Sequence, residues 1–180
     1  MGQDKTGLMI EGSPLWQRQI ATLRATGSSQ ILISGRSDGL YADSGLPIVE
    51  DAEPGLGPLG GIVTAMASAR HALVLVLAID LPRMTSAYLQ SLLPLAPVVP
   101  RHADRFEPLA AIYSKSCLGI FQRRLVQRRL SLQSAIHELV DSGNLAVHDV
   151  PAAEALLFDN FNTPEDLAYF VGPRHKRNRT

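Results

Sequence analysis

The stretch ALVLVLAIDLP, residues 72–82, decides the fold. Its first eight residues are apolar without alternation, which is typical of a strand buried on both faces of a parallel sheet. Asp80 follows at the end of that strand, and ligands of open α/β sheets bind beyond the carboxyl ends of the strands. Asp80 is therefore a candidate site residue. An equally good interpretation is that Asp80 caps the next helix or opens a turn.

Two shorter runs before this stretch repeat the pattern. Residues 31–33 (ILI) predict a strand that leads into the small-residue loop 34–39, and residues 47–49 predict a strand followed by Glu50 and Asp51. A helix is expected from Ser13 as N-cap, with Pro14 in its first position, to Gly27. A glycine-rich loop at 52–61 precedes another helix. Strands alternating with helices predict a doubly wound α/β sheet.

The second half of the chain has a looser pattern. It predicts helices at 86–93, 114–130 and 131–143 and strands at 97–100, 107–113 and 145–150, the last of them half-exposed. Four arginines in the first long helix of this half, at 123, 124, 128 and 129, are interpreted as a solvated face. We expect a single domain over residues 1–171 and a basic, disordered tail over residues 172–180.

Composition narrows the function classes. The chain of 180 residues has 17 basic and 17 acidic side chains, a balance that does not favour a nucleic-acid or membrane partner. Its apolar runs are shorter than a membrane span and its first residues show no signal-peptide pattern. A single cysteine, Cys117, predicts a packing role and a reducing compartment. These observations together indicate a cytoplasmic protein.

The sequence contains an ordered set of short motifs. Each motif occurs widely, but the set as a whole is specific. The motifs are Met1-Gly2-x-Asp4-Lys5, Gly12-x-Pro14-Leu15, Glu50-Asp51, Gly57-Pro58-Leu59-x-Gly61, Asp80-x-Pro82, Glu107-Pro108-Leu109 running into Tyr113, and Asn160-x-Asn162-Thr163-Pro164-Glu165. In this order and at nearly these spacings, the set resembles the molybdenum cofactor guanylyltransferases over residues 1 to about 170.

That resemblance implies a three-layer, Rossmann-like nucleotidyltransferase fold with a mostly parallel sheet. It also implies transfer of GMP from Mg-GTP to molybdopterin, with release of pyrophosphate and with molybdoenzymes or their chaperones as further partners. The cytidylyltransferase that makes the corresponding cytosine dinucleotide is the alternative enzyme. A non-catalytic protein that binds molybdopterin or a partner is the alternative from another class.

The start of the chain departs from the family pattern. Family members have a buried strand and a loop of the form Leu-Ala-Gly-Gly-x-Ser-x-Arg before the motif that begins here at Met1. The usual first strand and phosphate-holding loop are therefore missing from this sequence. We expect Met1 to be an internal methionine of a longer protein. If Met1 is the natural start, the expectation is a degenerate, weakly active or inactive paralogue.

The resemblance also assigns roles to individual residues. Lys5 would hold the triphosphate and Asp80 would bind Mg²⁺, and both would be catalytic; Mg²⁺ prefers oxygen ligands and bridges carboxylates to phosphates. The other expected nucleotide contacts are Asp51, Gly57, Gly61 and Ser34, which stands near a position where many family members carry Asn; the expected acceptor contacts are Arg105, Asn160 and Asn162. The competing interpretations are a solvated lysine, a plain turn at Gly57-Pro58, a surface arginine and an Asx-turn that caps a helix at Thr163.

Overall fold

The computed structural model describes residues 9–10, 12–51 and 53–160. Its main sheet contains β5 (Leu73–Leu77), β8 (Ala110–Ser114), β6 (Val98–His102) and β7 (Arg105–Phe106) in that order, and β9 (Ala146–Asp149) also pairs with β6. The β6–β9 pairing is parallel and the other pairings in this sheet are antiparallel. A separate parallel pair consists of β3 (Ile33–Ser34) and β4 (Ile48–Val49), and β1 (Met9–Ile10) pairs with β2 (Ser13–Pro14).

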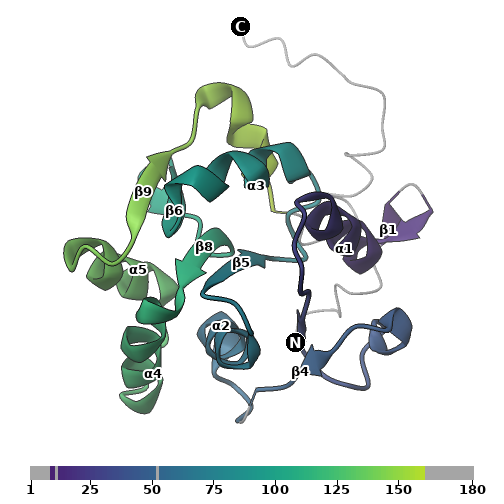
Figure 1. Ribbon diagram of the computed structural model, residues 1–180, viewed down its shortest axis with the longest axis horizontal. Helices are drawn as coiled ribbons and strands as arrows, with labels where there is room; N and C mark the ends of the chain where they lie inside the picture. The colour runs from purple at the N-terminus through teal and green to yellow at the C-terminus, as the bar shows by residue number, and fades with distance from the viewer. Residues whose placement is uncertain (1–8, 11, 52, 161–180) are drawn as a thin grey trace, which may run out of the picture.

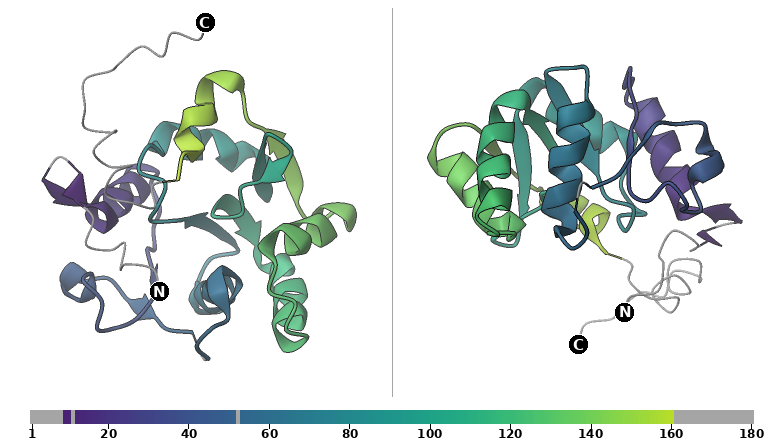
Figure 2. Two further views of the ribbon diagram at one scale, coloured as in Figure 1. Left: turned by 180° about the vertical axis from the view of Figure 1, so that it is seen from behind. Right: turned by 90° about the horizontal axis from the view of Figure 1, so that it is seen from below.

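Helices cover both faces of the main sheet and give the fold three layers (Figures 1 and 2). On one face lie α2 (Gly57–Ser68), α4 (Leu118–Val126) and α5 (Leu132–Asp141). On the other lie α3 (Ser86–Leu92) and the short 3-10 helix η5 (Ala152–Phe158). The helix α1 (Leu15–Ala25) lies beside α3, since Gln90 Nε2 donates to the carbonyl of Ala25 at 3.1 Å. Further 3-10 turns are η2 (Ala42–Ser44), η3 (Leu93–Leu95) and η4 (Lys115–Cys117).

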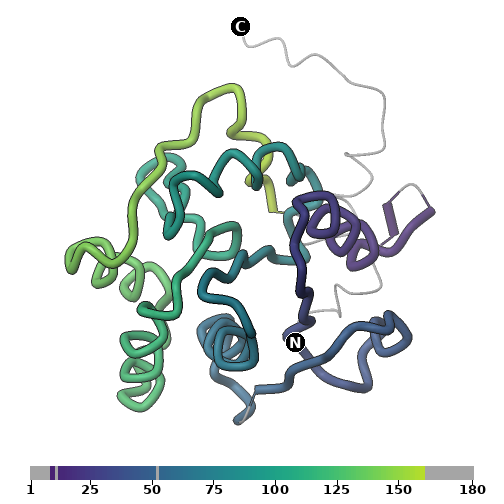
Figure 3. The backbone as a smooth tube through the Cα atoms, in the orientation of Figure 1, coloured from purple at the N-terminus to yellow at the C-terminus, as the bar shows by residue number. Residues whose placement is uncertain are grey.

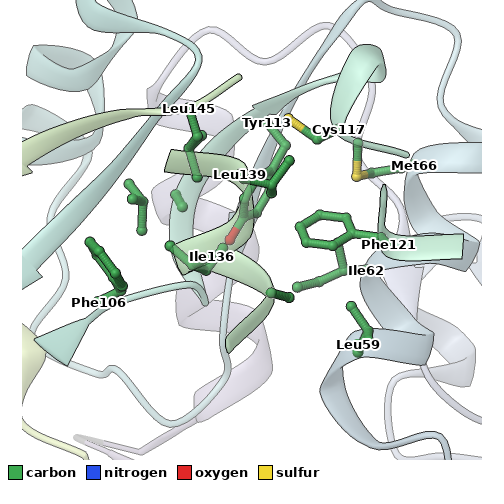
Figure 4. Close-up of a cluster of buried hydrophobic side chains, with 13 residues drawn as sticks. Leu59, Ile62, Met66, Phe106, Tyr113, Cys117, Phe121, Ile136, Leu139 and Leu145 are labelled. Atoms are coloured by element: carbon green, nitrogen blue, oxygen red, sulfur yellow. The ribbon is translucent and has the colours of Figure 1, made fainter. Parts of the chain in front are cut away.

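The larger core cluster lies between the main sheet and α2, α4 and α5 (Figure 4). At its centre Tyr113 packs edge-to-face on Phe121, with ring centroids 5.3 Å apart. The Tyr113 hydroxyl donates to the Pro108 carbonyl at 2.7 Å, which satisfies the one polar atom of this buried ring. Cys117 is buried in the same cluster, so its predicted packing role is confirmed.

The second core cluster lies between the sheet and α3. Tyr88, Leu89 and Leu92 of α3 pack on Ile112 of β8 and on the partly buried Leu75 of β5. The side chains of β5 therefore alternate, with Val74 and Val76 on the first cluster and Leu75 and Leu77 on the second. Both faces of β5 are covered by helices, as the apolar run predicts.

The α/β fold expected from the sequence is confirmed, and its sheet is mixed. The expectation that residues 72–79 form a strand buried on both faces of a parallel sheet is wrong in two respects. Leu73 is 45% exposed and Leu75 is only partly buried, and the described pairing of β5, with β8, is antiparallel. The reason is that β5 pairs with β8 on one side while its other edge borders a cavity. The expected tail, residues 172–180, lies outside the described residues.

Two local predictions are also wrong. Ser13 does not cap α1, because Ser13 and Pro14 pair with β1 and the helix begins at Leu15 without a side-chain cap. Arg124 is not on a solvated face: it is 5% exposed, its Nη1 binds Glu138 Oε2 at 2.7 Å and its Nη2 binds Ser134 Oγ at 2.8 Å. The buried charge is therefore neutralised by a residue of α5.

Candidate active site

A cavity of about 1320 Å³ lies between the β3–β4 pair and the free edge of β5. Its lining includes five of the residues that the sequence singles out: Ser34, Asp51, Gly57, Gly61 and Asp80. These residues come from three separate connections of the chain. The structure therefore brings together most of the predicted nucleotide contacts that it describes.

Two hydrogen bonds orient the walls of this cavity. Ser29 Oγ lies 3.1 Å from His71 Nε2, and the Arg70 amide donates to Gln30 Oε1 at 2.9 Å. The segment that enters β3 therefore starts beside the segment that enters β5. Figure 3 follows the chain from α1 through β3 to β4 past the end of β5. Ser34 ends β3, Asp51 follows β4 and Asp80 follows β5, and all three line this one cavity. Ligands of α/β sheets bind beyond the carboxyl ends of strands.

The first turn of α2 closes one end of the cavity. Gly57 has a φ of +62°, a left-handed conformation that favours glycine. A Cβ on Gly60 would come within 2.9 Å of Asp51 Oδ2, and a Cβ on Gly61 within 2.6 Å of Ser34 Oγ. The helix backbone can approach these side chains because both positions are glycine. A helix N-terminus without acidic residues in its first turn is a favourable neighbour for a phosphate.

Asp51 is held against the same helix. Its Oδ1 accepts a hydrogen bond of 3.2 Å from Thr64 Oγ1 of α2, while Oδ2 faces Gly60. The side chain is only partly buried and lines the cavity, so its carboxylate can accept hydrogen bonds from a bound base. The neighbouring Glu50 is exposed and instead accepts from the Ser37 amide.

Asp80 lies in the turn that follows β5, and α1 positions that turn. Nε2 of the buried Gln19 lies 3.0 Å from the carbonyl oxygen of Ala78 and 2.8 Å from that of Leu81. The helix α3 is capped by Thr85, whose side chain accepts from the Tyr88 amide at 3.2 Å. The interpretation that Asp80 caps the next helix is therefore wrong, and Asp80 lies within the turn after β5.

Glu107 is a candidate site residue that sequence analysis did not select. Burial raises the pKa of this carboxyl to about 7; the Arg105 guanidinium opposes the shift and the Asp80 carboxylate adds to it. Glu107 is therefore close enough to Asp80 for their charges to interact. The sequence signal was the motif Glu107-Pro108-Leu109 after a polar turn, which does not by itself indicate burial beside another acid.

The raised pKa of Glu107 predicts that the stability of the protein depends on pH. Its folded pKa of about 7 lies above the ordinary 4.5, so its contribution to stability is full below pH 4.5 and is lost as the pH rises through 7. Glu107→Gln should therefore raise the free energy of unfolding at pH 8 by about 1 kcal/mol relative to the natural chain, a value reduced because the site is partly open to solvent. At pH 4.5 the two proteins should have equal stability.

Urea denaturation at both pH values measures this difference. The matched control is Glu138→Gln, because Arg124 and Arg123 lower the pKa of Glu138 by hydrogen bonding. That substitution should destabilise the protein at pH 8, with the opposite sign. If Glu107→Gln has the same effect at both pH values, the raised pKa is excluded.

The two described residues that are expected to contact the acceptor lie outside the cavity lining. Arg105 is exposed on β7 and Asn160 is exposed after η5, and neither belongs to the cavity lining. Arg83, three residues after Asp80, forms an ion pair of 3.8 Å with Asp159. The chain that leads into Asn160 therefore passes close to the Asp80 turn. Lys5 and Asn162 lie outside the described residues.

Comparison with known proteins decides the family. Residues 1–142 match the model of the MobA-like NTP transferase domain. The chain belongs to this family. A probable molybdenum cofactor guanylyltransferase from Opitutus terrae is 35% identical over 173 residues, which cover 92% of this chain and 86% of the relative. The chain is therefore a nucleotidyltransferase, as its ordered motifs predict.

Solved structures agree with this MobA-like fold. Molybdopterin-guanine dinucleotide biosynthesis protein A from Archaeoglobus fulgidus superposes with a TM-score of 0.73 at 24% identity, covering 93% of this chain and 89% of that one. Rv0371c from Mycobacterium tuberculosis, solved in complex with manganese, has a TM-score of 0.57 at 20% identity and covers 83% of each chain. Both comparisons bear on the fold alone.

Two negative findings concern the residues that the structure describes. Within residues 9–10, 12–51 and 53–160, no group of three or more His, Cys, Asp and Glu side chains is arranged to hold a metal ion. No helix in these ranges combines the length and apolar character needed to cross a membrane.

Proposed function

We propose that this MobA-like transferase moves GMP from Mg-GTP to molybdopterin and so forms the guanine dinucleotide cofactor. An oxygen of the terminal phosphate of molybdopterin attacks the α-phosphorus of GTP, the bond from that phosphorus to the β-phosphate oxygen breaks, and pyrophosphate leaves. The observation that carries the proposal is one cavity whose lining includes Asp80, Asp51, Ser34 and the glycine-rich start of α2.

Each group has a defined task in this reaction. Asp51 and the backbone carbonyls of the loop before α2 offer acceptors for the N1–H and N2 donors of guanine, and Gly57 and Gly61 allow that backbone to come close. The start of α2 lies where partial positive charge favours the phosphates. Lys5 is proposed to add a compact positive charge on the triphosphate.

The described residues fit a magnesium ion that is held mainly by substrate. Mg²⁺ sites of this kind use one or two carboxylates together with substrate phosphates. Asp80 supplies a carboxylate at the cavity, and no larger cluster of acids is present among the described residues. When bound, the ion would neutralise charge that develops on the phosphate oxygens. Asp80 would hold the metal, and Gln19 holds the turn that carries Asp80.

The acceptor is proposed to bind next to Asp80, in the region between Asp80, β7 and the end of η5. Arg105 beside Glu107 supplies positive charge for the anionic phosphate of molybdopterin, and Asn160 and Asn162 supply amide donors. Asn162 is also proposed near the metal. The dinucleotide would then pass to a molybdoenzyme or its chaperone. We propose a cytoplasmic location, because the reaction consumes GTP and Cys117 is a free thiol.

Side-by-side turnover with GTP and CTP tests the base specificity. With molybdopterin and Mg²⁺ present, pyrophosphate release should be faster with GTP than with CTP. A preference for CTP would replace this proposal with the cytidylyltransferase. Titration calorimetry with Mg-GTP alone separates catalysis from binding: heat of nucleotide binding is expected, and its absence would favour a non-catalytic protein.

A further inference from the structure

A single strongly basic side chain lines the described part of the cavity. Among the described residues of the lining, Arg36 alone is an arginine or lysine, and it lies in the connection between β3 and β4, beside β4 in Figure 1. The same lining includes the acids Asp38, Glu50, Asp51 and Asp80. Ionised carboxylates accept hydrogen bonds and do not donate them. Arg36 is therefore the permanently charged donor that the described lining offers to acceptor atoms of a ligand.

Asp38 fixes the plane of the Arg36 guanidinium. Arg36 Nε donates to Asp38 Oδ1 at 2.8 Å, and Nη2 donates to Asp38 Oδ2 at 2.6 Å. A paired contact of this kind sets both the direction and the plane of a guanidinium. It occupies one edge of the group and leaves Nη1 and the second N–H of Nη2 to form another parallel pair of hydrogen bonds. A ligand with two adjacent acceptor atoms matches this second edge.

The loop that carries Arg36 has a defined shape. Tyr41 is 8% exposed and fills the inside of the loop. A Cβ on Gly35 would collide with the Tyr41 hydroxyl group, and a Cβ on Gly39 would come within 2.7 Å of the Tyr41 ring. The loop can close around this ring because both positions are glycine. Arg36 is thereby held in place before a ligand binds, which lowers the ordering cost of binding.

Arg36 lies next to the segment that leads into Asp51. The backbone amide before Arg36 donates to the Val49 carbonyl at 3.0 Å, and the amide after it donates to the Glu50 carboxylate. Asp51 is the next residue of that segment, and it is proposed to accept from N1–H and the 2-amino group of guanine. A base held by Asp51 would therefore meet Arg36 at an adjacent edge.

We propose that Arg36 is a specificity-determining residue of the nucleotide site and donates two parallel hydrogen bonds to O6 and N7 of guanine. This inference rests on the proposed transfer of GMP. O6 and N7 are adjacent acceptors, and their pairing with an arginine is the commonest base-specific contact in protein–DNA complexes. Adenine and cytosine carry an amino group at the corresponding position, whose N–H groups would face those of Arg36. Arg36 therefore favours GTP over ATP and over CTP.

A contact to the triphosphate is the competing use of the same charge. Loss of such a contact would weaken the binding of every nucleoside triphosphate equally. Loss of a contact to the base would weaken the binding of those nucleotides alone that carry the contacted atoms. Two analogues of GTP separate these cases, because 7-deaza-GTP lacks N7, which Arg36 would contact, and ITP lacks the 2-amino group, which Asp51 would contact.

Calorimetric titration of Mg-nucleotides into the full chain tests the contact without molybdopterin. The natural chain should bind GTP about five-fold or more tightly than 7-deaza-GTP. Arg36→Met keeps the aliphatic part of the side chain and removes every donor, so this variant should bind the two nucleotides equally well. Its preference for GTP over ITP should be unchanged, because Asp51 is intact. The Arg36 side chain is 82% exposed, so the substitution should leave the fold intact.

Arg129→Met is the matched control, because Arg129 is exposed and lies outside the cavity lining. This variant should bind GTP, 7-deaza-GTP and ITP as the natural chain does. The inference alone is overturned if the natural chain binds GTP without preferring it to 7-deaza-GTP, if Arg36→Met retains that preference, or if Arg36→Met loses affinity for all of these nucleotides to the same extent. If the natural chain binds no Mg-GTP, the proposed function fails together with the inference.

Discussion

Asp80→Asn is expected to lower the turnover number for GMP transfer by about 10²–10³-fold, because removal of one electrostatic contact to the reacting phosphates has effects of this size. The side chain lines the cavity at the end of β5, and the substitution keeps its shape while it removes the charge that would hold Mg²⁺. Pyrophosphate release at saturating Mg-GTP and molybdopterin measures the effect.

The matched control is Asp141→Asn, the same change at an exposed position at the end of α5 and outside the cavity lining. This variant should keep the activity of the natural chain. Both variants should unfold at temperatures close to that of the natural chain, which separates loss of chemistry from loss of fold. Full activity of Asp80→Asn would remove Asp80 from the site.

Gln19→Leu is expected to lower the free energy of unfolding by about 2–4 kcal/mol, because it leaves buried carbonyl groups without their donor. The carbonyls of Ala78 and Leu81 that accept from Gln19 flank Asp80 on both sides. Activity should therefore fall together with stability. Helix propensity is not the cause, since leucine and glutamine are similar in helices. Urea denaturation measures the change.

Gln17→Leu provides the comparison within α1. Gln17 is exposed, and the same substitution there should change stability by no more than about 0.5 kcal/mol. An equally small effect at Gln19 would show that the turn around Asp80 does not depend on α1. A stable but inactive Gln19→Leu variant would mean that positioning of Asp80, rather than folding, is the main role of this side chain.

Strands and helices could be predicted where the residues of one short stretch are sufficient to determine them. The apolar run at 72–79 is β5, shortened to five residues, and the alternating run at 145–150 is the partly exposed strand β9. The glycine-rich loop leads into α2 as expected, with Gly57 as its first residue. Patterns of apolar and turn residues are properties of a few consecutive positions, so the sequence contains them directly.

The site was predictable in part. The rule that ligands bind at the carboxyl ends of parallel strands predicted that Asp80 and Asp51 would meet, and both line the same cavity. Their catalytic and nucleotide-binding roles remain predictions. Glu107 was not selected, because its raised pKa depends on burial and on two charges that only the folded chain brings near it.

The sequence by itself determined the α/β class and the strand ends that carry polar side chains, because these depend on local periodicity and on turn residues. Only the tertiary structure decided the burial of Arg124 beside Glu138, the mixed pairing of the main sheet and the half-exposure of β5. Burial and strand pairing depend on residues that are distant along the chain. An apolar run therefore reveals that a strand exists, but not whether each of its edges has a neighbour.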